Sequence, residues 1–215
     1  MDLFDGLEPP QGGREQMAPG AVLLRGRASG CGAALLDVIA GIAAEAPFRR
    51  MVTPGGFTMS VAMTNCGAAG WVTDRRGYRY AAQDPQTGRP WPAMPDVFAR
   101  LAQEAAAEAG YPGFRPDVCL INRYEPGAKM ALHQDKDERD FASPIVSVSL
   151  GLPAVFRFGG ARRADPVVKY PLRHGDVVVW GGESRLWFHG IDALKPGAHP
   201  LAGPVRFNLT FRKAL

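Results

Sequence analysis

The stretch Arg206-Phe207-Asn208-Leu209-Thr210-Phe211-Arg212 alternates polar and apolar side chains from its first residue to its last. Side chains two positions apart in a strand share a face, so this stretch predicts a strand with both phenylalanines and the leucine in the core. The opposite face then carries the asparagine, the threonine and both arginines. Such a strand needs a sheet to pack in, and the residues before it supply one.

The chain from Asp117 onward is rich in short β-forming runs that Gly and Pro turns separate. These runs are Val118–Tyr124, Ile145–Leu150, Val155–Phe158, Val167–Leu172, Asp176–Trp180, Leu186–His189 and Arg206–Arg212. Regular short strands with turn signals predict an antiparallel sandwich or barrel. We therefore expect an α+β, mainly β fold: a double-stranded β-helix (jelly roll) with flanking N-terminal helices.

Two helices are expected before the β-rich part. Ala33–Ala46 is rich in Ala, Leu and Ile, and Ser29 lies upstream near an N-cap position. Pro95–Gly110 begins at a proline and ends at a glycine, and its apolar residues recur on one face. These are the helices that we expect to flank the jelly roll.

The chain divides into an arm and one domain. Residues 1–20 are rich in Gly, Pro and acidic residues and predict a flexible N-terminal arm. Residues 21–215 are expected to form a single domain, with the jelly-roll core at about 117–215. Residues of about 47–92 contain short alternating runs, which indicate mobile hairpins that form a lid beside this core.

Composition excludes few functions, but it indicates the partners and the compartment that suit the protein. A formal net charge of +4 and a pI of about 9.1 permit a polyanionic partner without demanding one. The three cysteines are far apart, so no disulfide framework is expected and a reducing compartment fits. The acidic N-terminus does not resemble a signal peptide, and no charge-free stretch is long enough to span a bilayer. We expect a cytoplasmic monomer without a membrane partner.

Two of the four histidines open an H-x-D triplet, a pattern that can supply two metal ligands from one segment. His133-Gln134-Asp135 lies among polar residues after a Pro-Gly turn, whereas His174-Gly175-Asp176 feeds an apolar strand and fits a turn better. We favour His133 and Asp135 as ligands, although a solvated loop could hold both by chance. His189, at the end of an apolar run, is the expected third ligand, and His199 is expected at the surface. Two histidines and one carboxylate indicate non-haem iron(II).

The polar face of Arg206–Arg212 has two interpretations. One is an exposed edge strand with basic residues. The other is an anion site in which the planar guanidinium groups hold the carboxylates of a small dicarboxylic acid. In a neighbouring run, Asn122 and Tyr124 share a face and could donate to the same anion.

Trp71–Trp91 mixes aromatic residues with arginines. Aromatic rings can stack on bases and arginines can pair with phosphates, so this segment could grip a nucleotide. The simpler interpretation is a hairpin with aromatics on the core and arginines in water. Asp137 likewise is either a surface acid or the partner of a base made cationic by N-alkylation.

Taken together, these motifs resemble the AlkB family of nucleic-acid demethylases over nearly all of residues 47–212. The resemblance rests on Asn122-Arg123-Tyr124 with Pro126-Gly127, on His133-Gln134-Asp135-Lys136-Asp137-Glu138, on His189-Gly190 and on Arg206–Arg212. It implies the jelly-roll fold with a nucleotide-recognition lid. The departures are mild: Arg79 stands where an apolar residue is expected, and the chain ends soon after Arg212.

The resemblance also implies roles for individual residues. The iron ligands would be His133, Asp135 and His189, and these would be the catalytic centre. The 2-oxoglutarate contacts would be Asn122, Tyr124, Arg206, Asn208 and Arg212, with the two arginines at opposite ends of the cosubstrate. The substrate residues would be Trp71, which stacks on the damaged base opposite His133, together with Tyr78, Arg79, Tyr80, Asp137 and Arg163.

The implied activity is oxidative demethylation of N-alkylated bases of the 1-methyladenine and 3-methylcytosine type. Fe(II), 2-oxoglutarate and O2 would hydroxylate the alkyl group, with release of aldehyde, succinate and CO2. The expected partner is alkylated DNA, single-stranded in preference to double-stranded DNA or RNA, because an unpaired base leaves the stack most easily. Two other functions stay open: an oxygenase that acts on a protein or a small molecule, and a non-catalytic jelly-roll nucleic-acid binder.

Overall fold

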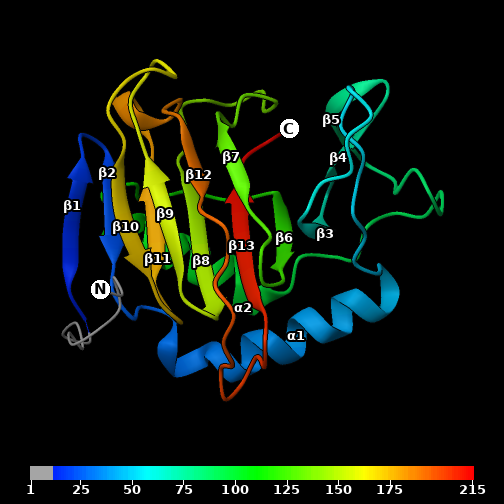
Figure 1. Ribbon diagram of the computed structural model, residues 1–215, viewed down its shortest axis with the longest axis horizontal. Helices are drawn as coiled ribbons and strands as arrows, with labels where there is room; N and C mark the ends of the chain where they lie inside the picture. Colours follow the sequence, from blue (N-terminus) through cyan, green and yellow to red (C-terminus); the bar gives the residue numbers. More distant parts are fainter. Residues whose placement is uncertain (1–11) are drawn as a thin grey trace.

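The computed structural model describes residues 12–215, and two facing sheets dominate it (Figure 1). The larger sheet has the order β1-β2-β11-β8-β13-β6-β3, and the smaller has the order β10-β9-β12-β7. Strands β4 and β5 form a separate hairpin that stands beside the sheets. The paired strands of both sheets are antiparallel throughout, as the jelly-roll prediction requires.

The larger sheet contains β1 (Arg14–Ala18), β2 (Ala21–Leu24), β3 (Ala62–Gly67), β6 (Val118–Tyr124), β8 (Ile145–Gly151), β11 (Val177–Trp180) and β13 (Arg206–Arg212). The smaller sheet contains β7 (Met130–His133), β9 (Ala154–Phe158), β10 (Val168–Leu172) and β12 (His189–Ile191). The hairpin consists of β4 (Gly70–Asp74) and β5 (Gly77–Ala81), and the helices are α1 (Gly32–Glu45) and α2 (Asp96–Glu108).

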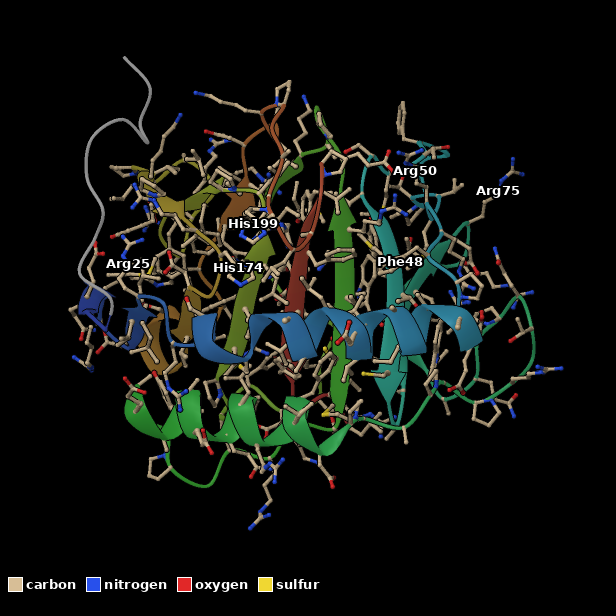
Figure 2. All side chains as sticks on the ribbon, turned by 90° about the horizontal axis from the view of Figure 1, so that it is seen from below. Arg25, Phe48, Arg50, Arg75, His174 and His199 are labelled. Carbon is tan, nitrogen blue, oxygen red and sulfur yellow. The ribbon has the colours of Figure 1, made fainter. Side chains whose placement is uncertain are left out.

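Two apolar layers lie on either side of the larger sheet. One layer joins the buried faces of α1 and α2 to the outward side of the sheet, and Leu35 and Phe98 belong to it. Figure 2 shows both helices crossing this side of the molecule. The other layer fills the space between the sheets, with Trp180 and Phe156 among its largest members. The helices therefore close one side of the larger sheet, and the smaller sheet covers the other.

Strand β13 has the bounds that the alternating pattern predicts, and it lies between β8 and β6. Leu209 and Phe211 are fully buried in the layer under the helices, which confirms the predicted core face. The polar face is buried as well, since Arg206 and Arg212 are only 1% and 5% exposed. This excludes the interpretation of an exposed edge strand and places two guanidinium groups between the sheets.

Several sequence expectations need correction. The arm expected over 1–20 contains β1, which pairs with β2, so the larger sheet begins before residue 21; residues 1–11 lie outside the described range. The strand expected at Leu186–His189 instead starts at His189, because a 3-10 turn and a loop occupy the preceding residues. Ser29 lies in a 3-10 turn and does not cap α1, whose N-terminus has no side-chain cap.

The second helix agrees with the prediction, since Pro95 is its N-cap and Gly110 follows it with a φ of 99°. Strands β2 and β7 were not predicted, because each is only four residues long and lacks the alternation that marks β13. Within residues 12–215, no helix combines the length and apolar character that crossing a membrane requires.

Candidate metal centre and anion pocket

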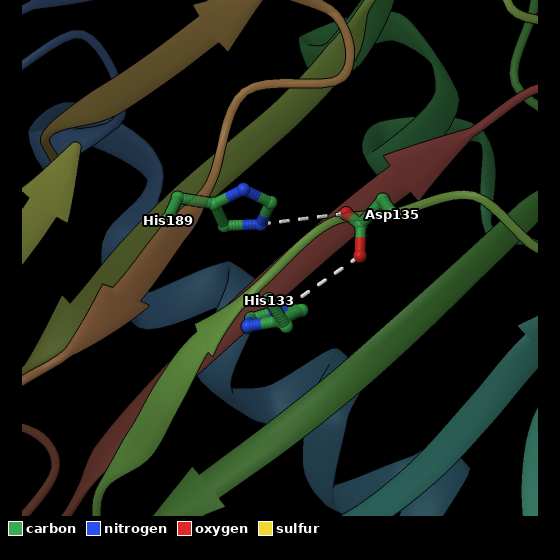
Figure 3. Close-up of side chains that lie close together, drawn as sticks. All are labelled: His133, Asp135 and His189. Carbon is green, nitrogen blue, oxygen red and sulfur yellow. Dashed lines mark ion pairs between the residues drawn. The ribbon is translucent and has the colours of Figure 1, made fainter. Parts of the chain in front are cut away.

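Three predicted ligands converge on one point (Figure 3). His133 ends β7 and His189 begins β12, and the two residues are cross-strand partners in the smaller sheet. Asp135 lies in the loop after β7. The two ligands of the H-x-D triplet are therefore the last residue of a strand and a loop residue, and not two residues of one strand. Both histidine Nε2 atoms lie 3.7 Å from carboxylate oxygens of Asp135. One ligand atom from each residue falls within 4.8 Å of the other two.

Backbone carbonyls fix the orientation of both rings. The Nδ1 atom of His133 lies 2.9 Å from the carbonyl oxygen of Ala131, and that of His189 lies 3.0 Å from the carbonyl oxygen of Trp187. A carbonyl oxygen only accepts, so each Nδ1 must donate and each Nε2 is left with a lone pair. This outer support is what a histidine ligand requires, because it fixes the tautomer and aims Nε2 at the metal.

The charge states suit a cation. Burial, followed by the nearby His133, lowers the pKa of His189 to about 4, so its ring is neutral at pH 7. Burial opposes ionisation of Asp135, but Arg212 and the two histidines together outweigh it and lower the pKa of that carboxyl. Two imidazole nitrogens and one carboxylate that line one cavity fit a non-haem iron(II) centre.

A buried guanidinium without a full set of partners lies beside this centre. Arg206 donates from Nη2 to the hydroxyl of Ser149 at 3.0 Å, and its charge lies 4.9 Å from the ring centre of Tyr124. Its Nε and Nη1 are buried and find no acceptor among the described residues. A buried charge needs a counter-ion, so these two nitrogens indicate a site for an anion.

The second arginine makes a different contact. Arg212 donates from Nε and Nη2 to Oδ2 of Asp135, at 3.0 and 2.7 Å, so it holds a metal ligand directly. Its Nη1 is buried and has no acceptor in the described part of the chain. Arg212 can therefore hold the ligand carboxylate and still direct one N–H toward an anion.

Amide and hydroxyl groups complete the pocket. Asn208 accepts from the Nδ2 of Asn122 at 3.1 Å and from the hydroxyl of Thr210 at 3.0 Å, and it donates to Ser147 at 2.8 Å. All five residues expected to bind 2-oxoglutarate line one cavity with the three metal ligands. That cavity is lined by Leu120, Asn122, Tyr124, Met130, His133, Asp135, Ser147, Phe156, Trp180, His189, Gly190, Ile191, Arg206, Asn208, Thr210 and Arg212.

The other two histidines lie elsewhere and stack on each other, with ring centres 4.4 Å apart (Figure 2). The backbone N–H of Gly151 donates to Nδ1 of His174 at 3.1 Å. Asp176 accepts from Arg25 at 3.1 Å and from the backbone of Gly26, so it organises a turn. The alternative H-x-D pair is therefore structural, and His199 is half-buried against His174 where the sequence predicts a surface residue.

A second pocket opens above the metal ligands and shares His133, Asp135 and Arg212 with the first. The rings of Trp71 and Tyr78 stack there with centres 5.6 Å apart. The Nε1 of Trp71 donates to Oδ2 of Asp137 at 2.8 Å. This aromatic pair and its carboxylate thus face the centre from the β4–β5 hairpin.

Arg163 also lines this second pocket, with its guanidinium 4.8 Å from the ring centre of Phe188. The other two predicted substrate residues do not line it. Arg79 lies on the far face of the hairpin, paired with Asp74 at 2.8 Å, so its expected base contact has no support in the geometry. Tyr80 lies beneath the pocket, and its hydroxyl donates to Glu138 at 2.7 Å.

Sequence reasoning missed three buried polar residues around the site. Ser149 holds Arg206, while Glu138 and Arg185 form an ion pair at 3.3 Å beside Asp135. Glu138 falls within the His133–Glu138 motif, but nothing in its type or spacing indicates that it is buried. Arg185 follows a 3-10 turn in the long segment before His189, and no local pattern marks it.

Comparisons with known proteins agree with this geometry. The family model of the 2OG-Fe(II) oxygenase superfamily matches residues 20–212. The alpha-ketoglutarate-dependent dioxygenases AlkB of Salmonella typhimurium and of Escherichia coli K12 are 62% and 61% identical, over 100% of this chain and 98% of each relative. The solved structure of OsALKBH1 superposes with a TM-score of 0.82 at 30% identity, covering 94% of this chain and 100% of that one.

Proposed function

Since the chain belongs to the AlkB dioxygenases of the 2OG-Fe(II) oxygenase superfamily, we propose a role for each of its site residues in oxidative dealkylation. The protein is an Fe(II)- and 2-oxoglutarate-dependent dioxygenase that removes alkyl groups from nucleic-acid bases. One observation carries the assignment: His133, Asp135 and His189 converge beside the buried Arg206, beneath a pocket faced by Trp71.

His133, Asp135 and His189 hold the iron. Their Nε2 atoms and carboxylate point to a common centre, and the carbonyls behind both rings keep the histidines in the ligating tautomer. Arg212 keeps Asp135 ionised and fixes its oxygens. Bound Fe(II), with 2-oxoglutarate and O2, supplies the oxidation that hydroxylates the alkyl carbon, while 2-oxoglutarate leaves as succinate and CO2.

Arg206 binds the far carboxylate of 2-oxoglutarate. Its Nε and Nη1 are free to donate to oxygens of 2-oxoglutarate, and Ser149 and the ring of Tyr124 fix the orientation of the guanidinium. Burial raises the pKa of Tyr124, so its hydroxyl stays protonated and can donate to the same carboxylate. The open Nη1 of Arg212 and the amide of Asn122 face the other end of the cavity, next to the metal ligands.

The alkylated base enters the second pocket. Trp71 offers a ring on which the base stacks, and the ring of His133 lines the same pocket. Asp137, held by Trp71, presents a carboxylate to a base that N-alkylation has made cationic. Arg163, at the rim, pairs with a phosphate. Once the alkyl carbon carries a hydroxyl, the C–N bond breaks and aldehyde is released.

The nucleic-acid substrate follows from relatives with this chemistry. Similar proteins include the mouse nucleic acid dioxygenase ALKBH1 and the Arabidopsis DNA N(6)-methyladenine demethylase ALKBH1C. These relatives disfavour the two alternatives, an oxygenase for proteins or small molecules and a non-catalytic binder. Single-stranded alkylated DNA should be preferred, because an unpaired base reaches a buried centre at the lowest unstacking cost. A cytoplasmic location and a monomeric state remain predictions.

The test is formaldehyde release from a single-stranded oligonucleotide that carries 1-methyladenine or 3-methylcytosine. Wild-type protein with Fe(II) and 2-oxoglutarate should release formaldehyde in step with base repair, and His133→Ala should not. Competition between single-stranded DNA, duplex and RNA then ranks the substrates. A wild-type protein no more active than His133→Ala on every methylated oligonucleotide would rule the function out.

A further inference from the structure

Glu138 is a buried carboxylate to which the roles above assign nothing. Its side chain is 2% exposed, yet three donors from distant parts of the chain reach it. Oε1 accepts from the hydroxyl of Tyr80 at 2.7 Å and lies 3.2 Å from Nε of Arg212. Oε2 accepts from Nη2 of Arg185 at 3.3 Å. Both oxygens are therefore occupied, and one carboxylate joins two guanidinium groups and a phenol.

Both guanidinium groups that hold Glu138 also hold the metal ligand Asp135. Arg212 donates to its carboxylate, and Arg185 donates from Nη1 to its backbone carbonyl at 2.9 Å. Arg185 also donates from Nε to the carbonyl of Ser143 at 3.0 Å, which ties the network to the start of β8. Glu138 thus fixes the two groups that set the position and direction of Asp135.

The third donor comes from the hairpin. Tyr80 in β5 is the cross-strand partner of Trp71 in β4. Trp71 bonds Asp137 and Tyr80 bonds the next residue, Glu138, so a pair of facing hairpin residues is fastened to two consecutive acids of the ligand loop. The hairpin stands beside the sheets (Figure 1), and Asn65 of β3 also holds it through hydrogen bonds with the backbone of Trp71 at 3.0 and 3.1 Å. The Trp71 bond is at the exposed pocket, whereas the Tyr80 bond is partly buried.

Charge explains why the network needs an acid at this position. Asp135 and Glu138 carry two negative charges against the two positive charges of Arg185 and Arg212. Without the Glu138 charge, the cluster would carry net positive charge next to a divalent cation. The Arg212 guanidinium, which now contacts both carboxylates, would then interact with Asp135 alone. A buried cation without its partner is also strongly unfavourable in itself.

We propose that Glu138 is a positioning residue that couples the β4–β5 hairpin to the metal ligand Asp135, through Tyr80 on one side and Arg212 and Arg185 on the other. The inference rests on the proposed function, because the hairpin matters for catalysis only if it binds the alkylated base. A hairpin that has closed on a base would then raise the metal affinity of the site that contains Asp135. Coupling between two sites is reciprocal, so metal binding must in turn stabilise the hairpin.

The first experiment measures metal affinity without nucleic acid. Metal-free protein is titrated with Co2+, whose binding is followed by visible absorption, for wild type and Glu138→Gln. Loss of a residue that supports a metal ligand typically weakens affinity by roughly 10–100-fold, and we expect a loss of that order. Tyr170→Phe is the matched control, because Tyr170 donates its hydroxyl to Met17 far from the site. Unchanged Co2+ affinity in Glu138→Gln overturns the proposal.

The second experiment measures the coupling by amide hydrogen exchange in residues 70–81. In wild type, and in Tyr170→Phe, Co2+ should slow exchange in this hairpin. In Tyr80→Phe, which removes only one hydroxyl and leaves the Trp71–Asp137 bond, Co2+ should slow exchange in the hairpin less than it does in wild type. A Tyr80→Phe hairpin that Co2+ still protects as in wild type overturns the proposal. This variant also carries the test alone if Glu138→Gln does not fold.

Neither measurement uses a nucleic acid or turnover. A failed demethylase assay on wild-type protein would therefore remove the proposed function and leave the Co2+ and exchange results interpretable. Conversely, active enzyme with unaltered metal affinity and exchange in the variants would remove only the coupling.

Discussion

Replacement of Arg206 by Met is the sharpest test of how this chain holds its cosubstrate. Methionine is unbranched and apolar, so Arg206→Met removes the guanidinium and keeps a long side chain in the same space. The guanidinium has one acceptor, the hydroxyl of Ser149, and two buried nitrogens that no described residue satisfies. If those two nitrogens donate to oxygens of 2-oxoglutarate, the variant loses two charge-assisted hydrogen bonds.

The size of the effect follows from those two bonds. A hydrogen bond to a charged group contributes about 1.5–3 kcal/mol, so two of them contribute about 3–6 kcal/mol. Because each 1.4 kcal/mol is about tenfold in affinity, 2-oxoglutarate should bind about 100-fold to 10,000-fold more weakly. Arg206→Lys should recover only part of this, since an ammonium restores the charge but not the planar fork.

The assay is calorimetric titration of metal-loaded protein with 2-oxoglutarate, beside thermal melts without it. Arg157→Met, which alters an arginine paired with Asp192 in the smaller sheet, is the control. Burial lowers the pKa of Arg206, because desolvation disfavours the charged form of its guanidinium. Cosubstrate-free Arg206→Met should therefore melt no lower than wild type. An affinity within about threefold of wild type, well short of two lost bonds, would refute the reasoning.

Three further predictions concern other parts of the structure. Trp71→Ala should weaken binding of an alkylated oligonucleotide by about 1–3 kcal/mol, and Trp71→Phe should recover part of that binding, as measured by fluorescence anisotropy. Turnover of 2-oxoglutarate without nucleic acid should persist in Trp71→Ala, as measured by succinate release. Addition of Co2+ should raise the melting temperature of wild type in a concentration-dependent way and leave Asp135→Ala unchanged, because only the folded ligand set binds the metal; equal shifts in both would place the metal elsewhere. Burial, and then the neighbouring His199, lower the pKa of His174 from 6.5, so as the pH falls the unfolded chain binds protons that the folded chain does not. The free energy of unfolding should accordingly decrease from about pH 7.5 to about pH 5.5, and His174→Gln should flatten that slope in urea titrations; an unaltered slope would contradict it.

The elements that were predicted best are those whose sequence pattern is fixed by local geometry. Strands β6 and β13 have the predicted bounds: β13 because alternation along a strand reports which side chains share a face, and β6 because a β-rich run lies between turn residues. The helix after Pro95 is equally local, since a proline start and a glycine end are properties of the chain itself. The choice of His133 and Asp135 over His174 and Asp176 also came from the local setting of the two triplets.

What the sequence could not supply is the meeting of segments that are distant along the chain. Strands β1, β2 and β7 are too short to carry a periodic signal, and they exist because neighbouring strands satisfy their backbone groups. Arg79 was expected to touch the nucleotide, although the family has an apolar residue at its position, and the hairpin pairs it with Asp74 on the face opposite Trp71.

By itself the sequence determined the strand pattern, the ligand types and the family to which they belong. Only the tertiary structure decided that Arg206 is buried with two free nitrogens, that Arg212 holds Asp135, and that Glu138 joins the hairpin to that ligand. The physical reason is that a residue type and its local spacing fix the face on which a side chain lies. Its burial and its partners depend on contacts between distant segments, such as the Arg212–Asp135 pair, whose residues lie 77 positions apart, and no local pattern encodes these.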